Sequence, residues 1–212
     1  SFAGGRRFDV DVMDDLETAG LAFGRLSAQF IRDKVVPELD AFRFASYCGI
    51  SGVTKKEETL ADGAATVAAL SAAVTAMDDE EVTATGRYLF ITPTLLQGIN
   101  DMDTTKSKKV LEGFEQVIKV PQRRFYTAIK QLSGKTGEEA GGYTKATGAA
   151  NINFAIVQKD ALIQYTKHAA PKIIAPENNP DADAYVFGYR MVGIAKAYKN
   201  MLSGMYFSHD KA

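Results

Sequence analysis

The chain has 212 residues, of which 46% are hydrophobic and 24% are charged, so it is long enough to bury a substantial core without disulfides or metals. Its 25 basic and 26 acidic residues nearly cancel, which excludes a global field that would hold nucleic acid or an anionic membrane. No run approaches the ~20 apolar residues of a membrane-spanning helix. The single cysteine, Cys48, cannot form an internal disulfide, and we expect a buried thiol there.

The N-terminal quarter predicts a strand and then a long helix. Apolar residues alternate with aspartates over residues 8–12, which indicates a strand with one solvated face. Asp14 and Glu17 have the spacing of a capping box, and apolar residues at helical spacing follow, so a long amphipathic helix is expected over residues 14–47. Pro37 is expected to kink this helix or to start a second one.

The middle of the chain alternates between helices and strands. Residues 51–63 are polar and rich in turn formers, which indicates a hinge. Residues 57–81 are dense in alanine and predict a helix, and the apolar run 87–92 predicts a buried strand. Pro93 stands where the first residue of a further helix would be, with Thr92 as its cap.

The last half is expected to contain mainly strands. Residues 106–143 are irregular, with a strand in the stretch FEQVIKVP, and the Gly-rich residues 132–150 predict an exposed loop. Strands broken by proline turns follow from residue 151 onwards. Helices and strands alternate too unevenly for a doubly wound sheet, so the predicted fold class is α+β.

Nucleotide and zinc sites are not indicated. The stretch SGKTG matches the end of a phosphate-binding loop, but the motif needs a glycine where Ile129 stands. His168 and His209 have no Cys or His at ligand spacing. We therefore expect no catalytic residue, no cofactor and no metal.

The acidic stretch PENNPDADAY invites a calcium interpretation. A calcium loop that starts at Asp181 and continues with Asp183 would need a glycine where Val186 stands and a glutamate where Val192 stands. The stretch instead predicts a turn in which Asp181 bonds nearby backbone N–H groups before a new strand begins. A subunit contact is the remaining alternative.

Four blocks of sequence follow one another along the chain: RRFDVDVMDDLET, FIRDKVVPELDAFRFA, VPQRRFYT and IVQKDALIQYTKHAAPKIIAPENNPDADAYVFGYRM. In this order they resemble the major capsid proteins of tailed bacteriophages with the Hong Kong 97 fold. The resemblance runs from about Arg6 to Ala212. The structural positions of these blocks are Asp14, Glu17, Pro37, Glu38, Asp40, Pro121, Lys167, His168, Asp181 and Asp183.

The resemblance implies an α+β plate in which residues 14–47 form the spine helix. Residues 1–52 would be the first part of a peripheral domain and residues 53–175 an axial domain. Residues 176–212 would be return strands that complete the peripheral sheet beside residues 8–12. Family members also carry an N-terminal arm and a long hairpin, the E-loop, ahead of the spine helix. Only SFAGG precedes the first predicted strand here, so we expect this chain to lack both and assembly to depend on them.

The expected function is that of a capsid shell subunit without enzymatic activity. Its partners would be other copies in pentamers and hexamers, scaffold, portal or decoration proteins, and loosely held packaged DNA, with no membrane. The protein would be found in the virion capsid, and in the host cytoplasm during assembly. Candidate subunit contacts are Arg6, Arg7, Arg123, Arg124, Phe125, Gly141, Gly142 and Tyr143. A solvated basic edge and a flexible surface loop are the alternative interpretation of these residues.

Two other functions remain open at this point. An encapsulin-like compartment shell would use the same fold. A free-standing α+β binding protein or enzyme would instead have a deep pocket, or a pair of carboxylates with strongly shifted pKa values.

Overall fold

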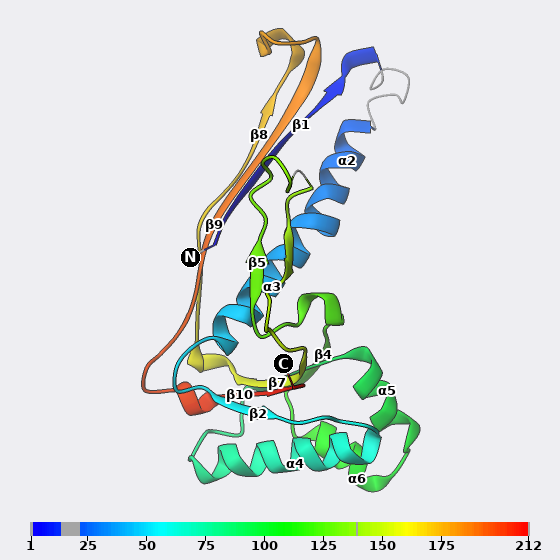
Figure 1. Ribbon diagram of the computed structural model, residues 1–212, viewed down its shortest axis with the longest axis vertical. Helices are drawn as coiled ribbons and strands as arrows, with labels where there is room; N and C mark the ends of the chain where they lie inside the picture. Colours follow the sequence, from blue (N-terminus) through cyan, green and yellow to red (C-terminus); the bar gives the residue numbers. More distant parts are fainter. Residues whose placement is uncertain (1, 14–21, 139, 212) are drawn as a thin grey trace. The chain divides into compact units, whose positions relative to one another are not determined.

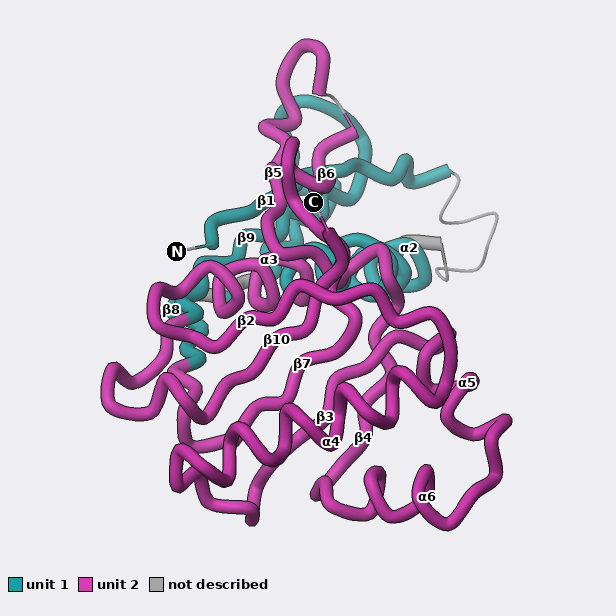
Figure 2. Tube along the Cα trace, turned by 60° about the horizontal axis from the view of Figure 1, so that its bottom comes forward, with its two compact units in different colours: residues 1–39, 164–195 teal, residues 40–163, 196–212 magenta. Residues whose placement is uncertain are grey.

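The computed structural model describes residues 2–13, 22–138 and 140–211 (Figure 1). The chain forms two compact units, each built from separate stretches of sequence (Figure 2). Unit 1 takes residues 1–39 and 164–195, and unit 2 takes residues 40–163 and 196–212. These limits differ from the expected 1–52, 53–175 and 176–212, because residues 164–175 join unit 1 while residues 40–52 and 196–212 join unit 2. Whether the units act as peripheral and axial domains stays a prediction.

Unit 1 contains a three-stranded sheet in the order β1–β9–β8. The strands are β1 (Phe2–Asp11), β8 (Leu162–Ile174) and β9 (Ala184–Ala197). β1 pairs with β9 in an unbroken antiparallel register that places Phe8 opposite Phe187. Their rings stack at 4.9 Å, and Phe30 packs edge-on against Phe8 at 5.6 Å. The predicted return of a C-terminal strand beside residues 8–12 is therefore confirmed.

The described part of the segment predicted as a long helix is helical, and a single spine helix over residues 14–47 stays a prediction. α2 (Ala22–Phe30), a π-helical segment (Ile31–Val35) and α3 (Val36–Cys48) follow one another without a gap. In the π-helical segment the Val36 N–H donates to the carbonyl of Ile31, five residues back. This wider π-helical turn lies directly before Pro37, whose ring would crowd the preceding turn of a regular α-helix. At Pro37 we expected a kink or the start of a second helix, and the structure instead has a change of helix type. The predicted capping box, Asp14 and Glu17, lies outside the described residues.

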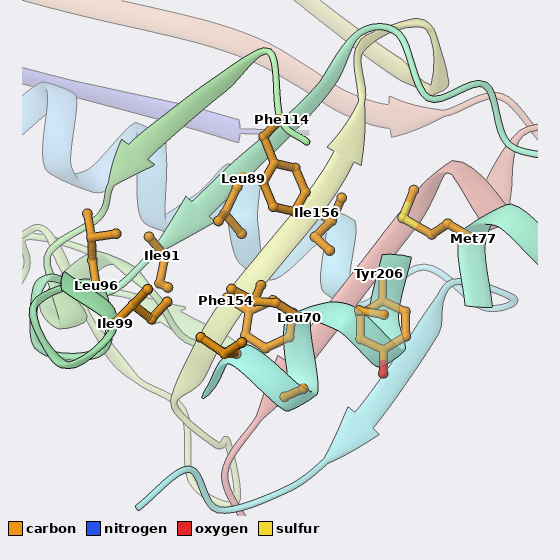
Figure 3. Close-up of a cluster of buried hydrophobic side chains, with 13 residues drawn as sticks. Leu70, Met77, Leu89, Ile91, Leu96, Ile99, Phe114, Phe154, Ile156 and Tyr206 are labelled. Atoms are coloured by element: carbon orange, nitrogen blue, oxygen red, sulfur yellow. The ribbon is translucent and has the colours of Figure 1, made fainter. Parts of the chain in front are cut away.

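Unit 2 contains a five-stranded sheet in the order β2–β10–β7–β3–β4. The strands are β2 (Thr54–Glu57), β3 (Arg87–Ile91), β4 (Gln116–Lys119), β7 (Ile152–Gln158) and β10 (Met205–His209). All seven residues of the central strand β7 are buried. The helices are α4 (Gly63–Asp79), α5 (Pro93–Asp101) and α6 (Thr105–Glu112). Leu70 of α4 packs with Leu89 of β3 and Ile156 of β7 in the hydrophobic core (Figure 3).

Three parts of unit 2 differ from the predictions. The expected hinge contains the strand β2, which pairs in parallel with β10. All four residues of β2 are exposed, so no apolar pattern marks the strand in the sequence. Pairing through backbone hydrogen bonds does not need such a pattern. β10 joins the sheet of unit 2 and not that of unit 1. α6 was not predicted, although Thr104 and Ser107 form a capping box there with serine in place of the usual glutamate.

The helix α5 begins at Pro93 as predicted, whereas α4 begins at Gly63, six residues after the start of the predicted helix 57–81. Asp62 caps α4 by accepting a hydrogen bond from the Ala65 N–H at 2.7 Å. Pro93 opens α5, but the Thr92 side chain makes no capping hydrogen bond. The Gly-rich residues 132–150 include the short strand β6 (Tyr143–Lys145), which pairs with β5 (Ile129–Gln131) as a hairpin. No helix in the described part of the chain is long and apolar enough to cross a membrane.

Candidate functional site

An open groove of about 740 Å³ lies on the sheet of unit 1. Gly5 stands opposite Arg190 and Gly188 stands opposite Arg7 in the β1–β9 register, so glycines alternate with arginines along the groove. A methyl group added at Gly188 would meet nothing closer than the Lys172 carbonyl at 3.8 Å. Gly188 therefore leaves the groove open beside Arg7, and cationic side chains border it.

The charges at the groove are only partly paired. Arg7 lies 3.3 Å from the Asp9 carboxylate and 3.7 Å from that of Asp181, and all three side chains are exposed. Exposed pairs of this kind contribute little to stability. Lys172 and Arg190 are exposed and make no ion pair with any residue that the structure describes. Arg6, the other arginine predicted as a contact, also lines the groove.

A second basic segment belongs to unit 2, in the 3₁₀ turn Gln122–Arg124. The Arg124 guanidinium lies 3.1 Å from the Asp40 carboxylate in a half-buried pair. Burial raises the pKa of Asp40, and Arg124 partly offsets that rise. The Tyr143 hydroxyl donates to the Arg123 carbonyl at 2.7 Å, which ties the turn to the β5–β6 hairpin. The structure thus brings Arg123, Arg124 and Tyr143 together, and their role in subunit contacts stays a prediction.

Phe125 does not belong to any contact surface. Its side chain is fully buried and packs edge-on against Phe44 at 4.7 Å. The prediction for this residue is wrong, because its aromatic ring fills the interior beside the basic turn and does not project from it.

The loop at the end of the hairpin is held by its own hydrogen bonds. The backbone at Gly141 and Gly142 is left-handed, with φ of 60° and 82°, a conformation that glycine adopts without strain. Glu138 accepts from the Lys130 ammonium at 2.6 Å and from the Ser133 N–H at 2.7 Å. The hydrogen bond from Lys130 has the larger effect and that from Ser133 the smaller, and together they lower the pKa of Glu138 to about 2.

The turn between β8 and β9 is organised by Asn179 and not by Asp181. The Asn179 side chain accepts from the Asp181 N–H at 3.3 Å and donates to the Ala184 carbonyl at 3.0 Å. Asp181 instead points its carboxylate at Arg7, so its predicted role in the turn is wrong. The carbonyl of Asp183 accepts from the Val12 N–H at 3.2 Å and joins the turn to the end of β1.

The other motif positions are dispersed. The Pro121 carbonyl accepts from the Arg124 N–H at 2.9 Å, and Glu38 lies on α3. Lys167 is exposed on β8, and His168 lies in the same strand. Cys48 is buried as predicted, and burial raises the pKa of its thiol to about 11. No group of three or more His, Cys, Asp and Glu residues able to hold a metal occurs in the described ranges.

Several solved structures are similar to this chain. A chain from Mycobacterium phage Che8 superposes with a TM-score of 0.62 at 12% identity, covering 98% of this chain and 70% of that one. The virus-like particle from Pyrococcus furiosus gives 0.63 at 9% identity, with 97% and 75% covered. The capsid structure of the cyanophage P-SCSP1u gives 0.57 at 14% identity, with 98% and 72% covered.

The chain has the capsid fold. Since these structures cover nearly all of this chain, the capsid fold includes both units. The fold class expected from the resemblance, the α+β Hong Kong 97 type, is confirmed. No protein-family model and no curated protein sequence matches the chain.

The sequence analysis missed Lys172, Arg190 and the glycines of the groove. These residues do not belong to a recognisable sequence motif. Arg190 lies beside Gly5 only because two strands from opposite ends of the chain pair with each other. The one available signal was an arginine two residues after a glycine in both strands, at Gly5 and Arg7 and at Gly188 and Arg190.

Proposed function

We propose that this protein is a structural subunit of an icosahedral phage capsid and that it assembles with other copies of itself. The observation that carries the proposal is the fold itself, which aligns over 98% of the chain with the cyanophage capsid structure. A second phage capsid structure, from Staphylococcus phage Andhra, aligns over the whole chain with a TM-score of 0.59 at 9% identity.

The proposal includes a structural role in place of an enzymatic one. The groove described above is open and bordered by cationic side chains, which suits a macromolecular contact better than an enclosed substrate. The groove and the basic turn of unit 2 are the surfaces we assign to contacts with other subunits. The protein would reside in the virion capsid and, during assembly, in the host cytoplasm.

Other partners follow from the same proposal. Scaffold, portal and decoration proteins would contact the shell, and packaged DNA would be held by confinement. The near-neutral net charge supports loose contact with DNA, because tight binding to phosphates needs many unpaired cations.

A second candidate is a compartment shell of the encapsulin type. The likeness to the virus-like particle from Pyrococcus furiosus supports a shell in general, and it supports this candidate no better than a phage capsid. The two candidates share the assembly step and differ in the contents of the particle. Purified particles that contain protein cargo and no nucleic acid would favour the compartment.

Assembly is the property to test. The purified chain is examined by light scattering and electron microscopy beside the same chain with an N-terminal arm and E-loop fused ahead of it, because assembly is expected to depend on them. We expect rings of five or six subunits or closed shells from the extended chain. If both chains stay monomeric, the proposal is contradicted, and a small ligand that raises the melting temperature would then point to a binding protein.

A further inference from the structure

Unit 1 carries opposite charges in two places on one sheet. Lys172 and Arg190 border the groove, and neither has an ion-pair partner within the described ranges. The turn between β8 and β9 carries exposed carboxylates on Glu177, Asp181 and Asp183. Asp181 is the member of this turn whose ion pair, with Arg7, is described. Cations and carboxylates for which no ion pair with a described residue occurs thus stand in neighbouring parts of the same unit.

The acidic turn lies on the same side of the sheet as the groove. Arg7 and Gly188 are directly opposite each other in an antiparallel pair, so the Arg7 side chain projects from the face that the groove occupies. The Asp181 carboxylate reaches the Arg7 guanidinium at 3.7 Å. The turn must therefore reach toward that face, where it can meet another molecule together with the groove.

We propose that the groove of one subunit binds the acidic turn, residues 177–183, of a second copy of this chain. Arg190 and Lys172 of one copy would face the carboxylates of Asp183 and Glu177 of the other. The inference rests on the proposed function, because it names the partner for one surface of the shell subunit.

The spacing of the charges suits a reciprocal contact. Arg190 and Ala184, the first residue of β9, are six residues apart, which is about 20 Å at ~3.3 Å per residue of extended strand, and the acidic turn directly precedes Ala184. A two-fold axis across the strand, midway between the groove and the turn, would place the turn of each copy at the groove of the other. Such an isologous interface satisfies both sets of charges at once.

A nucleic acid backbone fits this surface less well. Any strand that followed the sheet beyond the groove would meet Asp9 and the three carboxylates of the turn. These residues would repel phosphates as strongly as the groove attracts them. A protein segment with its own cations nearby has the complementary pattern.

Charge exchange tests the contact directly. Arg190→Glu and Asp183→Lys are prepared separately, and self-association is measured by sedimentation equilibrium at low salt. Each variant alone should associate roughly tenfold or more weakly than the wild type, because like charges then face each other. An equal mixture of the two should recover association, because the carboxylate introduced at position 190 then meets the ammonium introduced at position 183.

A matched control is available on the same sheet. Lys167 is an exposed cation of β8 that does not line the groove. Lys167→Glu makes the same charge change and should associate like the wild type. Recovery in the mixture also shows that both variants are folded, since unfolded chains would not complement each other.

Other outcomes overturn the inference. Variants that associate as strongly as the wild type would show that the groove does not hold the turn, and shells formed by all of them would leave the proposed function standing. An unrecovered mixture, together with weaker binding of a labelled DNA duplex by Arg190→Glu, would assign the groove to a polyanion. Conversely, recovery in the mixture without any ring or shell from the chain extended by an N-terminal arm and E-loop would contradict the proposed function alone.

Discussion

Arg87 gives the sharpest test of what holds unit 2 together. Its side chain is only 2% exposed at the start of β3. The Nε donates to the Thr83 carbonyl at 3.1 Å, and Nη2 donates to the Val82 carbonyl and to the Asp78 carboxylate. One guanidinium thus ties the end of α4 and the following turn to the sheet.

Replacement of Arg87 by alanine should lower the free energy of unfolding by about 4 kcal/mol. The loss of two buried methylenes accounts for roughly 1.6 kcal/mol at ~0.8 each. The two carbonyls that lose their donor account for about 2 kcal/mol together. The ion pair adds well under about 1 kcal/mol, because the Asp78 side chain is 56% exposed.

Urea unfolding followed by circular dichroism measures this change. Asp78→Ala is the matched control, because it removes the ion pair and leaves both hydrogen bonds to carbonyls in place. We expect it to cost less than about 1 kcal/mol. Equal losses for Arg87→Ala and Asp78→Ala would refute the reasoning, since the ion pair would then be the main contribution.

Three further predictions concern unit 2. Gly63→Ala should destabilise the chain by about 1–3 kcal/mol, because the new methyl group would lie 2.1 Å from the Gly98 carbonyl oxygen. Gly98→Ala should be tolerated, because its methyl group would meet nothing closer than 3.4 Å. Thermal melts of both variants test this difference. Tyr47→Phe should leave stability unchanged or raise it by about 1 kcal/mol in urea unfolding, because its buried hydroxyl has no hydrogen-bond partner among the described residues, and a clear loss would reveal a missed partner. Burial raises the pKa of the Cys48 thiol from 9.0 to about 11, so its contribution to stability should fall as pH rises through this interval; the difference in unfolding free energy between the wild type and Cys48→Ala should shrink there, and a constant difference would contradict the expectation.

Much of unit 2 could be predicted because its signals are local. The alanine-dense helix, the apolar run of β3 and the proline at the start of α5 follow one another in the sequence as they do in the structure. Each depends on periodicity or on the chemistry of a cap, and both act over a few residues. β9 was placed correctly beside β1 because of the resemblance, since no local pattern shows which strands pair.

The basic turn and the acidic turn show where sequence patterns fail. Phe125 belongs to a basic stretch whose composition predicts an exposed segment. Its ring is nevertheless buried, because it packs against Phe44 of α3. In the PENNPDADAY stretch, Asn179 and Asp181 are equally able to bond the backbone, and the position of Arg7 draws Asp181 away. Neighbours distant in sequence decided both outcomes.

The sequence by itself determined the α+β class and most of the elements, because hydrophobic periodicity and capping act within one helix or strand. Only the tertiary structure decided that β2 is a strand, that β10 belongs to unit 2, and that glycines and arginines of β1 and β9 form one groove. The physical reason is that strand pairing uses backbone hydrogen bonds, which every sequence offers equally. The choice of partner is therefore made by the packing of the whole sheet.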